Sequence, residues 1–394
     1  MSGVLARTNP ITFSPLMFGF RGPRGARAGK TRSTYRVAER LGVGLAVVLL
    51  VTFWMSDAKA DPAPLFRLHD PRLVELSGIA AGIASPGVLY VHNDSGDTAR
   101  FFALDRRTGR MLAQYTVPAA QNVDLEDIAV TRDARGSPSV WLADIGDNTG
   151  ARASVTIYRV DEPQVSPGTH RTRRPQVWRL RYPSGPVDAE SLAVSPRGVP
   201  YVITKSLSGV SQVYRAPAAP GASRLRRVAT IRFRLTGTPG PFAPFGELAA
   251  TGAAISRDGS LLVVRTYTDA YLWTVRQGDL ARVLHAPPTR LALPRQPQGE
   301  GVCFDGAHLL LDSEGRASAV YQLALPPLPL SSTSSPSATA TTPRTITGSP
   351  VRNSDPGLPI GIVEVFAVLV VLVGIGVAVP IRRRNRRGRA GSTP

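Results

Sequence analysis

Cysteine is almost absent from this chain, because Cys303 is the only one among 394 residues. A single cysteine excludes an internal disulfide and any metal site built from several thiolates. Cys303 falls in an apolar stretch, so we expect a small buried side chain rather than a reactive thiol. Lysine is also scarce, with three lysines beside 44 arginines, a bias typical of GC-rich genomes and compatible with an actinobacterial source.

The short motifs of several common enzyme classes are missing too. The chain contains no Gly-x-Ser-x-Gly, no His-Glu-x-x-His, no Walker loop and no Rossmann glycine pattern between a strand and a helix. A serine-hydrolase elbow, a zincin helix and a P-loop are therefore excluded.

The net charge of +19 is unevenly distributed. Residues 1–40 hold eight Lys/Arg and one acidic residue, and residues 381–394 hold six Arg and no acidic residue. Residues 61–325 are close to balance, with 30 basic and 24 acidic side chains. The excess of basic residues flanks the apolar runs, so it indicates how the chain is oriented in a membrane. Because residues 61–325 carry little net charge, we expect no nucleic-acid partner.

Residues 1–60 have the three-part pattern of a signal peptide with a long basic leader. An apolar run at 41–54 follows the basic region, and Ala58-Lys59-Ala60 forms a small-x-small cleavage site. The alternatives are a later start at Met17 or an uncleaved anchor. Cleavage is favoured because fourteen apolar residues are short for a membrane span.

The C-terminal region predicts a single membrane anchor. Residues 326–358 are rich in Pro, Ser and Thr and predict an extended stalk. Residues 359–380 predict a transmembrane helix, interrupted only by Glu364, and residues 381–394 a basic cytoplasmic tail. We therefore expect residues 61–325 to form an ectodomain on the extracytoplasmic side of the cell membrane.

A short sequence motif recurs five times within residues 61–325. Each copy contains small and apolar residues, then a turn, then a second apolar run. The copies begin at Ser77, Glu126, Glu190, Thr251 and Glu300, with spacings of 49, 64, 61 and 49 residues. Repeats of this length made of short strands are typical of a β-propeller. Fourth strands are predicted at 111–117, 176–181, 227–233 and 281–285, and residues 65–68 are expected to complete the fifth copy. This predicts an all-β propeller of five blades closed by an N-terminal strand, or of six if the longer gaps hide another element.

In a propeller, the first strand of each blade lines the central channel and the second returns beside it. The start of the first strand and the end of the second therefore share one mouth, where many acidic residues converge. The first-strand entrances carry Asp124, Glu126, Asp127, Asp188, Glu190 and Glu300. The second-strand exits carry residues 92–97, 144–148, 204–205, 265–267 and 312–314.

Three interpretations of this mouth stay open. Oxygen ligands from several blades suit Ca²⁺, and the expected ligands are Asn93, Asp94, Asp97, Asp144, Asp147, Asn148 and Asp312. Alternatively, the carboxylates cap turns and pair with Lys205 and Arg265. The third interpretation is an active site with Glu126, Glu190 or Glu300 as acid or base, in which the two basic side chains bind an anionic substrate.

Two further side chains are candidates for ligand binding at the mouth, Tyr267 and His92. His92 stands at the end of an apolar strand, which favours a structural hydrogen bond over metal ligation.

The loops at 92–97 and 144–148, with Glu126-Asp127-Ile128-Ala129, resemble those of secreted bacterial β-propeller proteins of the phytase-like or esterase-like kind. The resemblance covers residues 70–325 and implies calcium at the acidic mouth and, in some members, phosphate-ester hydrolysis. This chain has few basic residues there for phosphate. We therefore expect a cell-surface binding module with Ca²⁺ that recognises a wall component, a small ligand or a protein. The alternative is a secreted phytase-like or lactonase-like hydrolase.

Overall fold

The computed structural model describes residues 62–133, 135–275 and 280–328. The chain divides into two units, Met1–Ala60 and Asp61–Pro394, and all described residues belong to the second. The predicted signal peptide, transmembrane helix and tail, with nearly all of the stalk, lie outside the described residues. Among the residues that are described, no helix has the length and apolar character needed to span a membrane.

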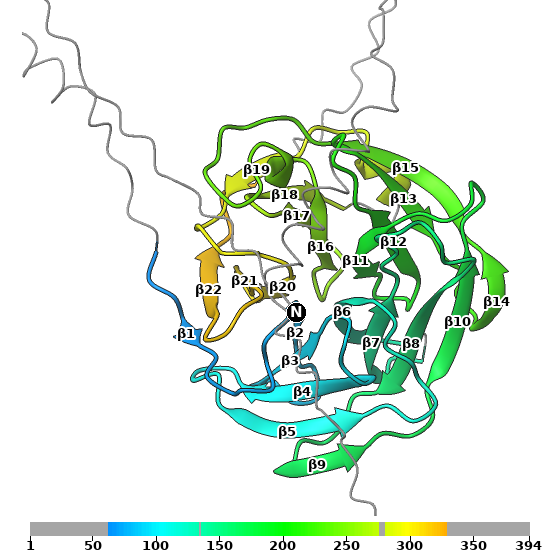
Figure 1. Ribbon diagram of the computed structural model, residues 1–394, viewed down its shortest axis with the longest axis vertical. Helices are drawn as coiled ribbons and strands as arrows, with labels where there is room; N and C mark the ends of the chain where they lie inside the picture. Colours follow the sequence, from blue (N-terminus) through cyan, green and yellow to red (C-terminus); the bar gives the residue numbers. More distant parts are fainter. Residues whose placement is uncertain (1–61, 134, 276–279, 329–394) are drawn as a thin grey trace, which may run out of the picture. The chain divides into compact units, whose positions relative to one another are not determined.

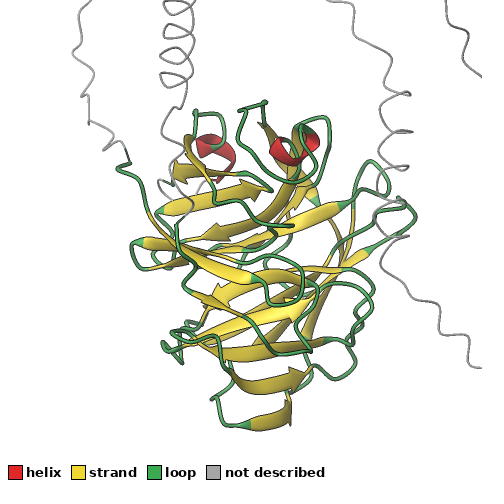
Figure 2. Cartoon of the chain, turned by 60° about the vertical axis from the view of Figure 1, so that its left-hand side comes forward, coloured by secondary structure: helices red, strands yellow, loops and turns green. Residues whose placement is uncertain are grey.

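The described residues form five sheets around one axis, which makes the fold a five-bladed β-propeller (Figure 1). The helical elements of the described residues are η1 (Phe245–Glu247) and α2 (Leu280–Val283). Figure 2 shows that strands and loops make up the rest. Blade 1 consists of β2 (Leu76–Ala81), β3 (Val88–Asn93), β4 (Arg100–Asp105) and β5 (Met111–Thr116). Blade 2 consists of β6 (Leu125–Arg132), β7 (Pro138–Asp144), β8 (Val155–Asp161) and β10 (Gln176–Arg181).

The other three blades repeat this antiparallel order from the axis outward. Blade 3 consists of β11 (Ala189–Val194), β12 (Pro200–Thr204), β13 (Val210–Arg215) and β15 (Arg226–Arg232). Blade 4 consists of β16 (Ala250–Ile255), β17 (Leu261–Thr266), β18 (Asp269–Thr274) and β19 (Thr289–Ala292). Blade 5 consists of β20 (Val302–Asp305), β21 (His308–Leu311), β22 (Ala319–Ala324) and β1 (Phe66–Arg67).

The ring is closed by the N-terminal strand, as the sequence predicts. β1 pairs antiparallel with β22, and Phe66 lies opposite Val320 in the ladder (Figure 1). Strands from both ends of the domain therefore share blade 5. This arrangement leaves no open edge between the first and last repeats.

The two longer repeat gaps contain edge strands rather than a sixth blade, so the six-blade alternative is wrong. β9 (Gly168–Arg171) leaves blade 2 and pairs in parallel with the outer strand β5 of blade 1 (Figure 1). β14 (Gly221–Arg224) leaves blade 3 and pairs in the same way with β10 of blade 2. Each extra strand extends the outer edge of the preceding blade.

The fourth strand predicted at 281–285 is also wrong. This segment begins with α2 (Leu280–Val283), a single helical turn, and the fourth strand is β19. Leu280 and Leu284 are buried in one core cluster with Trp273, so the apolar spacing of three to four residues marks a helical turn, not alternation.

The core lies between neighbouring blades, where aromatic and β-branched side chains interlock. Trp141 of blade 2 is fully buried, and its ring lies 5.0 Å from that of Trp178 in the same blade. Both belong to a cluster that continues to Val202 and Tyr214 of blade 3. Cys303 is buried in another cluster, which confirms the prediction of a small core side chain.

Candidate functional site

A β-bulge sits at the first position of the repeat in four of the five inner strands. In blade 2, Leu125 lies opposite Asp144 and Asp127 lies opposite Ala143, so Glu126 is an extra residue. The same register shift occurs at Ser77, Glu190 and Thr251. A bulge leaves its extra residue out of the ladder and re-aims the side chain.

Glu300 occupies the corresponding place in blade 5, two residues before β20 begins. These five positions and the residues that follow β3, β7, β12, β17 and β21 form one end of the propeller, here called the acidic end. All five bulge-level residues are buried.

Directly below the bulges, the inner strands approach each other closely. A Cβ placed on Gly301 would lie 2.7 Å from the Cα of Gly78, so only glycine fits there. Asp127 occupies the same level in blade 2 and is fully buried. Its carboxylate accepts backbone N–H bonds from Ile128 (2.8 Å), from Leu192 of blade 3 (2.7 Å) and from Ala253 of blade 4 (3.3 Å). Asp127 therefore ties three inner strands together.

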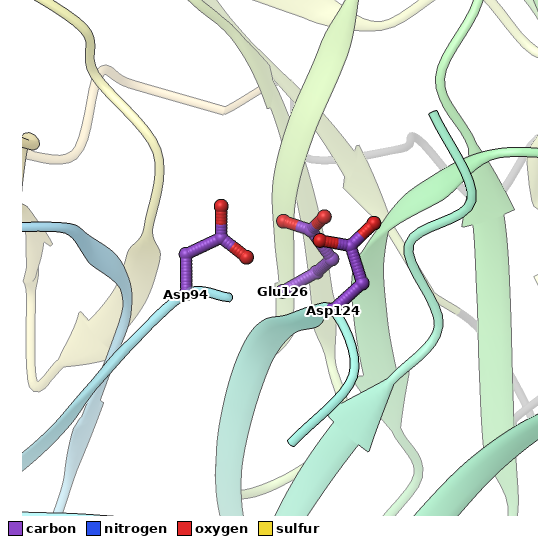
Figure 3. A group of neighbouring side chains, drawn as sticks. All are labelled: Asp94, Asp124 and Glu126. Carbon is purple, nitrogen blue, oxygen red and sulfur yellow. The ribbon is translucent and has the colours of Figure 1, made fainter. Parts of the chain in front are cut away.

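Three carboxylates meet between blades 1 and 2 at the acidic end. Asp94 follows β3, Asp124 precedes β6, and Glu126 is the bulge residue of β6. One oxygen from each side chain lies within 4.8 Å of the others (Figure 3). We call these residues the carboxylate triad. Gly146 packs against Glu126 and Asp124 so closely that any Cβ would collide with both carboxylates.

Burial and mutual repulsion disfavour the charged forms of the triad. Burial raises the pKa of Asp94 to about 7, and the charge of Asp124 adds to the effect. The pKa of Asp124 is raised by burial and by Asp188, and that of Glu126 is raised well above its usual range by burial and by Glu190. A bound cation would relieve both costs at once.

Most of the other predicted calcium ligands have partners inside the protein. Asn93 donates to the carbonyl of Arg72 (2.7 Å) and to Asp97 (2.9 Å), which pairs with Arg100 at 2.9 Å. Asp144 forms an ion pair with Arg152 at 3.0 Å.

The remaining three predicted ligands also serve the local structure. Asp147 accepts the N–H bonds of Ala151 and Arg152, and Asp312 accepts that of Gly301. Asn148 donates to Asp124 at 3.4 Å. The structure thus brings one of the seven predicted ligands, Asp94, into the triad. Asp124 was marked in the sequence only by its place at a repeat entrance, and Glu126 was predicted as an acid or base rather than as a metal ligand.

A second polar group surrounds Lys205, which follows β12. Its ammonium donates to Oε1 of Glu190 and to the hydroxyl of Tyr267 (2.9 Å). Burial opposes the charge on Lys205, but Glu190, Tyr267 and Glu300 together raise its pKa well above its usual value. Burial likewise raises the pKa of Glu190 to about 8 despite the attraction of Lys205. Burial, followed by repulsion from Glu190, raises that of Glu300 well above its ordinary range.

Two predicted ligand-binding residues are instead enclosed. Arg265 is 0% exposed and donates to the carbonyl of Gly301 (3.0 Å) and to Gln296 (3.0 Å). Burial lowers its pKa to about 10. His92 is equally buried, its Nδ1 lies 3.0 Å from the carbonyl of Asn93, and burial lowers its pKa to about 4. These contacts agree with structural roles for both side chains.

Comparison with known proteins adds little to this description. The chain matches no family model and no curated protein. Among solved structures it is similar to the PQQ-bound aldose sugar dehydrogenase from Streptomyces coelicolor. The identity is 13% and the TM-score 0.37, over 64% of this chain and 96% of that chain. At this level the likeness carries no argument, so the five-bladed propeller rests on the strand pairing. The resemblance to phytase-like or esterase-like propellers stays a prediction.

Proposed function

We propose that this protein is a membrane-anchored, extracytoplasmic binding module that holds Ca²⁺ at Asp94, Asp124 and Glu126. The observation that carries the proposal is the convergence of three carboxylate oxygens within 4.8 Å of one another, from two blades. Calcium takes six to eight oxygen ligands in flexible geometry, so water and loop carbonyls would complete the shell.

The donor set favours a hard cation over a transition metal. All three side chains of the triad are carboxylates, whereas zinc, copper and nickel sites usually include imidazole or thiolate. Two of the ligands come from loops and one from a bulge, an arrangement that suits calcium better than the rigid octahedron of magnesium. Extracellular calcium modules bind weakly, at about 10⁻⁴–10⁻³ M, which fits the predicted location outside the membrane.

The test is thermal unfolding of the purified full-length protein in mild detergent, with millimolar Ca²⁺ or with chelator. At about 10 mM Ca²⁺, roughly ten to a hundred times the expected Kd, binding to the native state should raise the melting temperature by roughly 3 °C or more. Asp124→Asn should abolish the shift. Asp161→Asn, a control on a 72% exposed side chain at the other end of β8, should keep it. An identical melting temperature with Ca²⁺ and chelator would remove the proposal.

A hydrolase is the second candidate function, and Glu300 is the observation that favours it. Burial and the neighbouring Glu190 raise the pKa of this carboxyl well above its ordinary range, which favours the protonated form that a general acid needs. Glu126 and Glu190 would then be the other acid–base candidates. Phosphate esters and lactones should be screened with Glu126→Gln and Glu300→Gln beside the wild type. If turnover is unchanged in both variants, neither carboxyl has a catalytic role.

A further inference from the structure

Two buried carboxylates at the acidic end each keep an oxygen without a donor. Glu190 is 4% exposed and Glu300 is 3% exposed. Oε2 of each has no hydrogen-bond partner among the described residues. Lys205 does not donate to either Oε2 atom, because its ammonium donates to Oε1 of Glu190 and to the hydroxyl of Tyr267. A buried acceptor left unpaired costs free energy, so both oxygens favour a donor from outside the chain.

The surrounding charge selects a cationic donor. Asp188 and Asp94 act on Glu190, and Glu190 and Glu314 act on Glu300. The opposing charges are Lys205, which acts on both glutamates, and Arg265, which acts on Glu300. A second metal ion fits less well. Among the described residues, the one group of three metal-ligating side chains is the carboxylate triad, which includes neither Glu190 nor Glu300. An ammonium group needs fewer acceptors and carries three N–H donors.

An aromatic pair lies next to Lys205, whose ammonium is 5.4 Å from the centroid of the Tyr267 ring. The ring of Tyr267 contacts that of Phe242 edge to face, with centroids 5.0 Å apart. Phe242 is 48% exposed, and its φ of 57° lies in the left-handed region that few residues other than glycine adopt. Glu247 holds the preceding loop by accepting the N–H bond of Gly237 at 2.7 Å. Strained backbone that presents an exposed aromatic ring is typical of a binding site.

We infer that Glu190, Glu300, Tyr267 and Phe242 form a second subsite, which binds a protonated primary amine on an alkyl chain. The ammonium donates to Oε2 of both glutamates, and the exposed ring of Phe242, backed by Tyr267, covers the alkyl chain and adds cation–π attraction. A lysine side chain and a free diamine share this chemistry. The inference rests on the proposed function only in treating the acidic end as a binding surface.

Isothermal titration calorimetry on the full-length protein in mild detergent, at low salt and saturating Ca²⁺, tests the subsite. The amine probes are 1,4-diaminobutane, which represents a free diamine, and Nα-acetyl-lysine amide, which represents a lysine side chain. The controls are tetramethylammonium, a cation without N–H donors, and 1,4-butanediol, a neutral analogue. We expect the amines to bind at least about tenfold more tightly than either control, since only they combine charge with donors.

Variants then locate the binding. Glu300→Gln should weaken the amine roughly tenfold, and Phe242→Ala about threefold, as loss of an exposed cation–π contact predicts. Asp161→Asn should change nothing. Asp124→Asn should lose the calcium response and keep the amine response, which separates this subsite from the triad. The melting temperature of each variant shows whether it is folded.

Three results overturn the inference: no heat from either amine with folded wild type, equal binding of tetramethylammonium, or unchanged amine affinity in folded Glu300→Gln. Binding of a second Ca²⁺ that is lost in Glu300→Gln and displaces the amine assigns the subsite to an inorganic cation instead. Amine binding without any calcium response refutes the proposed calcium site alone.

Discussion

Removing the Asp127 carboxylate should destabilise the whole propeller, because this side chain bonds the inner strands of three blades. In Asp127→Ala the N–H groups of Ile128, Leu192 and Ala253 lose their acceptor. Each of the three buried donors left unpaired costs about 1–3 kcal/mol, so the expected loss is roughly 3–9 kcal/mol. Asp127→Asn keeps one oxygen, which can serve the two donors that now share Oδ2. Its expected loss is about 1–3 kcal/mol, from the donor that then faces the amide NH₂.

Urea unfolding of the purified full-length protein, followed by tryptophan fluorescence and circular dichroism, measures both losses as changes in the free energy of unfolding. The order matters as much as the size, because alanine must cost more than asparagine if the hydrogen bonds are the cause. Asp161→Asn again serves as the exposed control. If both variants lose less than about 1 kcal/mol of unfolding free energy, water or a backbone shift replaces the carboxylate. Asp127 would then not stabilise the contacts between the three blades.

Two further predictions follow from the same end of the molecule. The folded-state pKa values of Asp94 (about 7), Glu190 (about 8) and Glu314 (about 8) are raised above their ordinary values. These carboxyls bind more protons in the native state than in the unfolded chain, so in chelator they should lower the stability as pH rises from about 4 to 8. Buried His92, whose pKa is lowered to about 4, opposes them only below about pH 6.5. Urea midpoints at pH 5 and pH 8 test this, and a chelated protein that is more stable at pH 8 contradicts it. Gly301→Ala should lower the melting temperature by several degrees, or prevent folding, because its Cβ would lie 2.7 Å from the Cα of Gly78. Gly87→Ala, at an open turn position without a positive φ, separates this clash from the general effect of adding a methyl group.

The blade count could be predicted because it rests on local patterns. Apolar alternation and turn glycines mark the first three strands of every blade, and the truncated fifth copy indicates the closing strand β1. The exchanged strands β9 and β14 could not be predicted in the same way. Both are short and largely exposed, and each pairs with a strand of another blade. The apolar and polar pattern within β9 and β14 does not indicate which strand of the other blade each one pairs with.

The sequence predicted at which end of the propeller the candidate site lies, but not which side chains form it. The acidic residues converge at one end, as expected from the repeat. Which carboxylates remain available depends on partners that the repeat does not reveal. Asp144 is paired with Arg152, which lies eight residues later and reaches back across the loop. The pairing of Asp97 with Arg100 is local, and its three-residue spacing was a sign that this carboxylate is engaged.

The five bulge-level positions divide into two kinds, and this division explains why the site lies where it does. Ser77 donates to the carbonyl of Glu126 (2.9 Å), and Thr251 donates to that of Glu300 (3.1 Å). Each hydroxyl thus links its own inner strand to the next blade. The glutamates are held by their backbone while their side chains remain available, and Glu190 shares only one of its oxygens with Lys205. Because a bulge residue is outside the ladder, its side chain can change without breaking strand pairing. The same backbone feature therefore provides both the links between blades and the buried carboxylates of the acidic end.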